Sequence, residues 1–255
     1  MPQLRALAAN IVFYVVTILW MLVCIPLFLG PSRWVTAAMK GWARTCMVVL
    51  HWLVGIRWEV RGLENLPRGE NGQPGFLLAS KHQSVWETFG LLPYLDGPIY
   101  ILKKELMAIP FYGWFAAKAG MIPVERSRNA QALRDMTKRA QQAMADDRQI
   151  IIFPEGTRRP VDAEPDYKSG IAHLYKQLDV PVVPVALNSG LFWPRRQFAR
   201  YPGTLVLSIL PPIEAGTDAR PMLAELERMI ETETAKLVAE ARAKGEGPQL
   251  ASSVD

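Results

Sequence analysis

Residues 149–159 read QIIIFPEGTRR, and this stretch decides the fold. Residues 149–153 form a short apolar run of the kind that makes a buried strand in a sheet covered on both faces. Pro154 and Gly156 interrupt that run at once, which places the polar residues that follow at the carboxyl end of the strand. Open α/β sheets bind their ligands at this end of their strands, so the turn is a candidate binding site.

The turn at residues 155–158 holds side chains suited to a phosphate group. Gly156 permits a positive φ or a close approach of the backbone to a ligand. Thr157 offers a hydroxyl, and Arg158 offers a planar fork of donors that matches phosphate. Glu155 is expected to accept hydrogen bonds from a polyol or to orient Arg158. The alternative interpretation of these residues is a charged surface turn.

Strand and helix patterns alternate on both sides of this stretch. The further strands are predicted at residues 57–62, 76–80, 98–102, 121–124, 182–187 and 204–210, and the helices at residues 82–95 after a loop, 111–119, 129–145, 169–178 and 217–243. This alternation predicts an α/β fold in which helices flank a largely buried sheet. We assign residues 57–243 to that domain and residues 244–255 to a flexible tail.

The segment before this domain is apolar. Residues 6–29 contain no charged side chain, and the run is long enough to cross the hydrocarbon core of a membrane. A second apolar stretch, residues 34–55, contains only two charged side chains, Lys40 and Arg44. Residues 1–56 are therefore predicted to form a pair of membrane-anchoring helices. A cleaved signal peptide and a buried helix of a soluble protein are the two alternatives.

The formal net charge of +5 belongs to the same part of the chain. Residues 1–62 contain six basic residues and one acidic residue, so the other residues are neutral as a whole. Five of the eight tryptophans also lie in residues 1–62. Tryptophan and cations that flank apolar segments are typical of a membrane–water interface with anionic lipid. The basic residues after the first helix favour the cytoplasmic face of the inner, or of an intracellular, membrane. Whether that helix spans the bilayer or lies in one leaflet stays open.

The composition excludes several other classes of protein. Half of the 255 residues are hydrophobic, which is enough for a large core and excludes a disordered or collagen-like chain. Two cysteines and three histidines are too few for a disulfide scaffold or for a Cys-rich or His-rich metal centre. The sequence contains neither a phosphate-binding P-loop nor a dinucleotide fingerprint. The neutral globular part argues against nucleic-acid binding.

Residues 80–87 read SKHQSVWE and begin at the end of a predicted buried strand. His82 and Glu87 are five residues apart, so they do not share a helix face. They meet if His82 lies in the turn and Glu87 on the first turn of the next helix, where Glu87 fixes the imidazole tautomer and leaves His82 as a general base. The alternative is structural, because Ser84 and Glu87 have the spacing of a capping box. No serine or cysteine nucleophile motif lies nearby, so the base would act on an external hydroxyl.

A third candidate lies at residues 120–126, GMIPVER, where Arg126 ends another predicted strand. The carboxyl ends of parallel strands meet at one edge of a sheet, which allows Arg126 and Arg158 to converge on one anion. Two arginine forks suit an anion with the charge of a phosphate.

Together these motifs resemble the 1-acyl-sn-glycerol-3-phosphate acyltransferase family. That family has a His-x4-Asp motif, a strand ended by an acid and an arginine, Phe-Pro-Glu-Gly-Thr-Arg, and a Val-Pro-x-x-Pro-Val strand. This sequence matches them in order at His82-x4-Glu87, Glu125-Arg126, residues 153–158 and residues 180–185, and matches the family's Lys-Lys-Glu-Leu and Lys-x-Gly elements at residues 103–106 and 168–170. The resemblance covers residues 80–187. It departs at Glu87, which stands where the family has Asp, and this puts the detailed geometry of the pair in question.

The resemblance implies a glycerolipid acyltransferase-like α/β fold that transfers a fatty acyl group from acyl-CoA or acyl-carrier protein to the sn-2 hydroxyl of lysophosphatidic acid. The product is phosphatidic acid, in phospholipid biosynthesis. The resemblance makes His82 the general base, oriented by Glu87. It implies substrate-binding roles for a larger set: Arg126, Glu155, Gly156, Thr157, Arg158 and Lys104.

The same resemblance implies membrane lipids as partners and requires no cofactor, metal or nucleic acid. Two alternatives stay open. One is an acyltransferase with another acceptor, such as glycerol 3-phosphate, another lysophospholipid or a lyso-aminolipid. The other is a non-catalytic lipid-binding homologue.

Overall fold

The computed structural model describes residues 2–125 and 129–248. Within them the strands form one sheet in the order β1-β7-β6-β2-β5-β3-β4. The strands are β1 (Ile56–Arg61), β2 (Phe76–Ser80), β3 (Pro98–Lys103), β4 (Ile122–Val124), β5 (Gln149–Ile152), β6 (Val182–Leu187) and β7 (Gly203–Ile209). Both ends of each strand lie within one residue of the predicted ends, so the predicted fold class, an α/β sheet flanked by helices, is confirmed.

The two strands that precede the main motifs lie side by side in the centre of the sheet. β2 and β5 are parallel, with Ala79 opposite Ile152, and every residue of both strands is buried. The other neighbouring strands are also parallel, except for the antiparallel pair β6 and β7. The residues that follow β2 and β5 therefore meet at one edge of the sheet.

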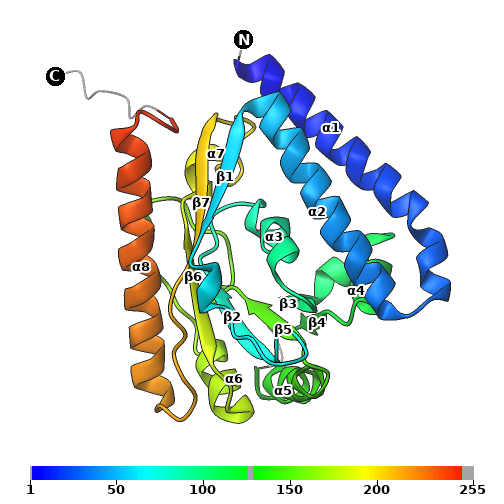
Figure 1. The fold of residues 1–255 in the computed structure, drawn as a ribbon, viewed down its shortest axis with the longest axis vertical. Helices are drawn as coiled ribbons and strands as arrows, with labels where there is room; N and C mark the ends of the chain where they lie inside the picture. The colour runs from blue at the N-terminus through cyan, green and yellow to red at the C-terminus, as the bar shows by residue number, and fades with distance from the viewer. Residues whose placement is uncertain (1, 126–128, 249–255) are drawn as a thin grey trace.

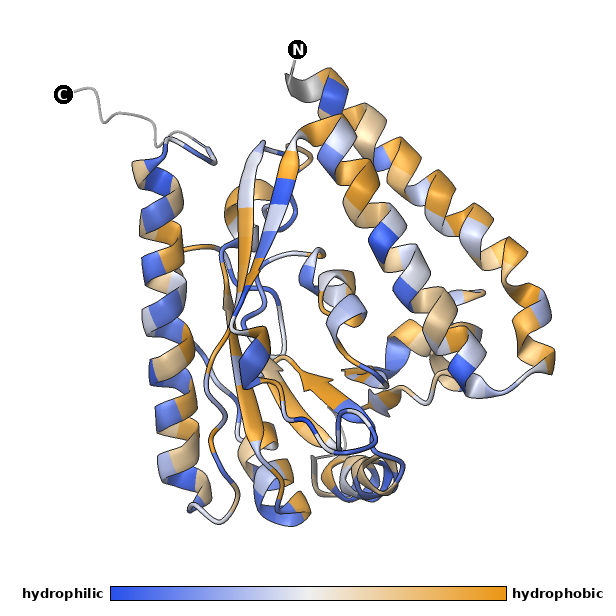
Figure 2. Ribbon diagram, viewed as in Figure 1, coloured by the Kyte–Doolittle hydropathy of each residue, from blue (hydrophilic) through white to orange (hydrophobic). Residues whose placement is uncertain are grey.

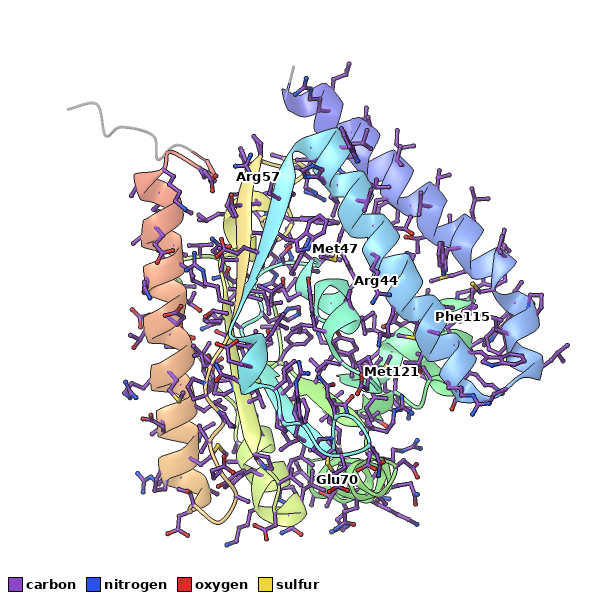
Figure 3. All side chains as sticks on the ribbon, in the orientation of Figure 1. Arg44, Met47, Arg57, Glu70, Phe115 and Met121 are labelled. Atoms are coloured by element: carbon purple, nitrogen blue, oxygen red, sulfur yellow. The ribbon has the colours of Figure 1, made fainter. Side chains whose placement is uncertain are left out.

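Helices lie on both sides of the sheet, which Figure 1 shows nearly edge-on with α8 on one side and the α1–α2 pair on the other. The helices are α1 (Pro2–Val23), α2 (Ser32–Val54), α3 (Glu87–Gly90), α4 (Tyr112–Lys118), α5 (Asn129–Ala145), α6 (Gly170–Leu178), α7 (Ser189–Phe192) and α8 (Ala219–Ala243). Helices α3 and α4 lie between α2 and the sheet. Phe115 of α4 and Met121, labelled in Figure 3, lie on this α2 side.

Helix α1 packs with one face and exposes apolar side chains on the other. Its segment Leu4–Val23 is the one helix in the described part of the chain that is long and apolar enough to cross a membrane, with a mean hydropathy of 2.3. Only 17% of that window is buried, so α1 is not the enclosed core helix of a soluble protein. Its exposed large apolar residues are Leu4, Leu7, Ile11, Tyr14, Val15, Ile18, Leu19, Leu22 and Val23. This face makes α1 a candidate for membrane association (Figure 2).

Helix α2 shares the core of the α/β domain. Val35, Cys46 and Leu50 are buried in the same apolar cluster as the residues of β2. Helix α1 joins this unit through Phe13, whose ring contacts Trp193 edge-on with centroids 5.4 Å apart. The helical pair therefore packs directly on the domain that it precedes.

Two short helices differ from the sequence-based expectation. The helix expected within residues 82–95 is reduced to the single turn of α3, followed by a 3₁₀ turn at Leu92–Tyr94. Pro93 lacks the amide hydrogen that a continuing α-helix needs, which explains this early end. Helix α7 was not expected, because a four-residue turn carries no periodic pattern.

Candidate active site

The ends of β2 and β5 bring the two main motifs into direct contact. The imidazole of His82 stacks on the ring of Phe153, with centroids 4.0 Å apart and planes inclined by 16°. The amide of Arg159 donates a hydrogen bond of 2.8 Å to the carbonyl of His82. The parallel pairing of the two strands thus fixes the imidazole against the turn of the second motif.

His82 and Glu87 meet as the spacing predicts. Nδ1 of His82 lies 2.9 Å from Oε1 of Glu87, whose side chain is fully buried. The same Oε1 accepts hydrogen bonds from the backbone amides of Gln83 and Ser84, at 2.7 and 2.6 Å. Glu87 therefore holds both His82 and the loop before α3, whereas α3 itself has no side-chain cap.

The bonds of Glu87 determine the tautomer of His82. Its second oxygen, Oε2, accepts a hydrogen bond of 2.8 Å from the hydroxyl of Ser189 in α7. An ionised carboxylate only accepts, so Nδ1 of His82 carries the shared proton. Neutral imidazole then has its lone pair on Nε2, which is the nitrogen able to take a proton.

The turn after β5 has the backbone form expected for its glycine. Gly156 has a φ of 64°, a region that disfavours other residues, and its amide donates to the carbonyl of Phe153 at 2.8 Å. Arg195 supports the next residues, because its Nη1 donates a hydrogen bond of 2.6 Å to the carbonyl of Arg158. The half-buried Arg158 is thereby held from a separate loop.

A pocket of about 1130 Å³ opens beside this contact. Its polar lining includes His82, Gly156, Thr157, Arg158 and further cations from Lys168 and Arg195. Its apolar lining includes residues of both N-terminal helices and of α4 and α5: Trp20, Met21, Met39, Trp42, Phe115, Leu133 and Met136. The arrangement is thus a large, mostly apolar cavity whose lining also includes an imidazole and several cations.

The outcome differs for the other three predicted substrate-binding residues. Arg126 lies outside the described residues. Lys104 does not belong to the described lining of the pocket, but its ammonium bonds Oε2 of the lining residue Glu125 at 2.8 Å. Glu155 lies in the pocket wall, yet its side chain is 1% exposed and its Oε1 is 2.9 Å from Nζ of Lys81.

Sequence reasoning missed two contributors to the site. Ser189 bonds the carboxylate of Glu87, and Tyr100 donates a hydrogen bond of 3.3 Å to the backbone carbonyl of Glu87. Burial raises the pKa of Tyr100 well above its usual value, so this hydroxyl stays a donor. The available signal for Ser189 was its position just after a buried strand, the same signal that revealed His82.

No group of three or more His, Cys, Asp or Glu side chains suited to a metal ion occurs among the residues that the structure describes.

Comparison with known proteins gives consistent relatives. Residues 57–188 match the model of the Acyltransferase family. The chain is 36% identical to the 1-acyl-sn-glycerol-3-phosphate acyltransferase of Pseudomonas aeruginosa, over 79% of this chain and 77% of that protein. It is 32% identical to the human 1-acyl-sn-glycerol-3-phosphate acyltransferase alpha, over 67% of this chain and 59% of that protein.

The fold has a solved counterpart. The crystal structure of the 1-acyl-sn-glycerophosphate (LPA) acyltransferase from Thermotoga maritima superposes with a TM-score of 0.76 over 93% of this chain and 98% of that chain. At 21% identity, this likeness concerns the fold. The family match and the sequence relatives carry the assignment: the chain belongs to the 1-acyl-sn-glycerol-3-phosphate acyltransferase family.

Proposed function

We propose that the protein transfers a fatty acyl group from a thioester, acyl-CoA or acyl-carrier protein, to the sn-2 hydroxyl of lysophosphatidic acid. The observation that carries this proposal is the His82–Glu87 pair in the wall of a mostly apolar pocket that also presents Arg158. A base, an anion-binding fork and room for an acyl chain are the three elements that this acceptor requires. The names of the relatives support the same acceptor.

His82 begins the proposed reaction. Its Nε2 takes the proton of the sn-2 hydroxyl, and the oxygen attacks the thioester carbonyl. The tetrahedral intermediate then collapses and expels the thiolate, which takes the proton back from His82 and leaves as the free thiol. The new ester remains in phosphatidic acid. Glu87 holds the imidazole and stabilises the positive charge that it gains, as a carboxylate does in hydrolase triads.

The acceptor phosphate binds the cations of the pocket in this proposal. Arg158 supplies a planar fork for it, and Arg126 adds positive charge from the chain just before α5. Lys104 lies outside the described lining and would act through its ion pair with the lining residue Glu125. Gly156 and Thr157 shape the turn beside the phosphate. The reaction needs no metal or cofactor, because the thioester itself supplies an activated acyl group.

Membrane attachment through α1 completes the proposal. The exposed apolar face of α1 would lie in the headgroup region of the cytoplasmic leaflet while its other face stays on the domain. Trp20 and Met21 of the same helix line the pocket. A lysolipid acceptor would then enter the pocket from the surface on which the helix lies.

A panel of acceptors tests the proposal. Purified protein in mixed micelles is given one labelled acyl-CoA and, in parallel, lysophosphatidic acid, glycerol 3-phosphate, lysophosphatidylcholine or a lyso-aminolipid. Lysophosphatidic acid should show the highest kcat/KM, because Arg158 and its neighbouring cations favour a phosphate monoester. A preference for any other acceptor, glycerol 3-phosphate included, would overturn the assignment. No transfer to any acceptor from either acyl-CoA or acyl-carrier protein would identify a non-catalytic lipid-binding protein.

A further inference from the structure

The side chain of Lys81 is buried on the α8 side of the sheet, where the proposed mechanism does not use it. Its Nζ lies 2.9 Å from Oε1 of Glu155 and 2.7 Å from Oε1 of Glu231 in α8. The hydroxyl of Tyr167 donates a hydrogen bond of 2.9 Å to the same oxygen of Glu231. We refer to Lys81, Glu155, Tyr167 and Glu231 as the Lys81 network.

Glu155 faces this network more than the pocket. Only 1% of its side chain is exposed, so the carboxylate offers almost no surface to a substrate. Oε1 bonds Lys81, and Oε2 is buried without a hydrogen bond in the described part of the chain. Burial raises the pKa of Glu155, and the ammonium of Lys81 acts in the opposite direction. The carboxylate of Glu155 therefore binds a side chain of the protein, Lys81.

The network ties α8 to the segments that build the pocket. Three of its members each precede a pocket residue in the chain: Lys81 precedes His82, Glu155 precedes Gly156, and Tyr167 precedes Lys168. Two backbone bonds link these segments further, from the amide of Arg159 to His82 at 2.8 Å and from the amide of Lys168 to Pro154 at 3.0 Å. A change in the network would therefore shift the turn at residues 155–158, while the bond to Glu87 keeps His82 in place.

Buried ion pairs suit such a task. Desolvation cancels much of their contribution to stability, but their geometry is specific and each partner depends on the others. Glu231 has 26% of its side chain exposed, and it does not line the pocket. It is thus the point at which the network can be altered without touching a substrate.

We propose that the Lys81 network is a positioning device that sets the turn at residues 155–158 relative to His82, so that Glu231 and Tyr167 control acceptor affinity from the far side of the sheet. This inference rests on the proposed function. It makes Glu155 a positioning residue, in place of the substrate contact expected from the sequence.

Two variants remote from the pocket, Glu231→Gln and Tyr167→Phe, test the inference. Each should raise the KM for the acceptor about tenfold while kcat and the KM for acyl-CoA change little, because only the acceptor site shifts. Glu231→Gln removes the charge that pairs with Lys81, and Tyr167→Phe removes one hydrogen bond to a charged group. Glu225→Gln is the matched control, because Glu225 lies on the same helix and forms its ion pair with the exposed Arg228, at 2.6 Å. Thermal unfolding of each variant shows whether it is folded at the assay temperature.

The outcomes separate this inference from the proposed function. The acceptor panel with the wild-type protein tests the proposed function. The positioning role of the network is tested separately, by the ratio of the acceptor KM of Glu231→Gln to that of Glu225→Gln. Both KM values are measured with the acceptor that the wild type prefers. If Glu231→Gln and Tyr167→Phe are both folded and their acceptor KM equals that of Glu225→Gln, the proposed positioning role of the network is wrong. An equal loss for donor and acceptor would also contradict it, because general loosening of the fold does not distinguish the two substrates. If Glu155→Gln alone raised the acceptor KM, Glu155 would be a direct contact and the inference would be wrong.

Discussion

Lys81 and His82 are neighbours in the chain but belong to opposite sides of the sheet. His82 lines the large pocket that reaches the α1–α2 pair, whereas Lys81 lines a smaller cavity beside α8. Adjacent side chains on extended backbone point to opposite faces, so the end of one strand supplies both. The α1 side therefore carries the proposed base and the α8 side a buried cation.

The outer surfaces of the two sides differ in the same way (Figure 2). Helix α8 buries an apolar stripe that includes Met222, Leu226 and Ile230 and exposes charged side chains, as a helix in water does. Helix α1 instead buries small residues such as Ala6 and Ala9 and exposes large apolar ones. The comparison indicates that polar contacts and water suit the α8 side, while the α1 side is suited to lipid.

The largest effect is expected from His82→Ala on the α1 side. Loss of a general base typically lowers kcat about 10²–10⁴-fold. Stability should change little, because Glu87 keeps its bonds to Gln83, Ser84 and Ser189. Turnover with labelled acyl-CoA and the unfolding midpoint are measured on the same preparation. Wild-type turnover in a folded variant would remove His82 from the mechanism.

Lys81→Met, at the residue before His82, should mainly lower the free energy of unfolding. It removes the nearer cation of the buried Glu155 carboxylate and leaves Arg159, whose Nε lies 3.9 Å from Oε1. Removal of one partner of a buried ion pair costs about 3–5 kcal/mol. Lys236→Met on α8 is the control, because Lys236 is 62% exposed and lies 3.6 Å from Glu233. Denaturant unfolding measures both free energies. Equal free energies of unfolding for the two variants would mean that the buried Lys81 contributes no more to stability than the exposed Lys236.

Local patterns explain how much was predictable. β2 and β5 are buried apolar runs that end in polar residues, so both the strands and the edge where His82 meets Phe153 follow from the sequence. The contact of His82 with Glu87 follows as well, because it depends on five residues of chain. These predictions needed no information beyond one strand, one turn and the pairing of parallel strands.

Long-range polar contacts were not predictable in the same way. Ser189 bonds Glu87 across 102 residues, and Lys81 bonds Glu231 across 150 residues. Glu231 stands in a helix with many charged side chains, and no local pattern distinguishes it from Glu225. Helix α1 presents the same difficulty, because hydropathy alone does not show that one of its faces packs on the domain.

A smaller effect is expected from Ile18→Glu on the exposed face of α1. Ile18 is 57% exposed in the protein and would be buried in lipid when α1 binds a membrane. Loss of this apolar side chain should weaken vesicle binding about tenfold or more. Thr232→Glu adds the same charge to exposed α8 and should leave binding near the wild-type value. Sedimentation with anionic vesicles gives both partition coefficients. Equal binding of the two variants would place the membrane contact elsewhere.

The smallest effect is expected from a thiol reagent, which should not react with Cys24 or Cys46 in the folded protein. Cys46 is fully buried, and burial raises its pKa to about 12; burial also raises the pKa of Cys24, which is 8% exposed. The thiolate is the reactive form, so at pH 8 only about one Cys46 in 10⁴ is ionised, and its cover of core residues keeps a reagent away. The folded protein in micelles should therefore not react with a thiol reagent, and both cysteines should react after denaturation. Thr232→Cys on α8 supplies an exposed thiol that reacts at an ordinary rate. Rapid labelling of native Cys46 would mean that α2 leaves the sheet when lipid is present, and the α1 side would then be a detachable anchor instead of a wall of the pocket.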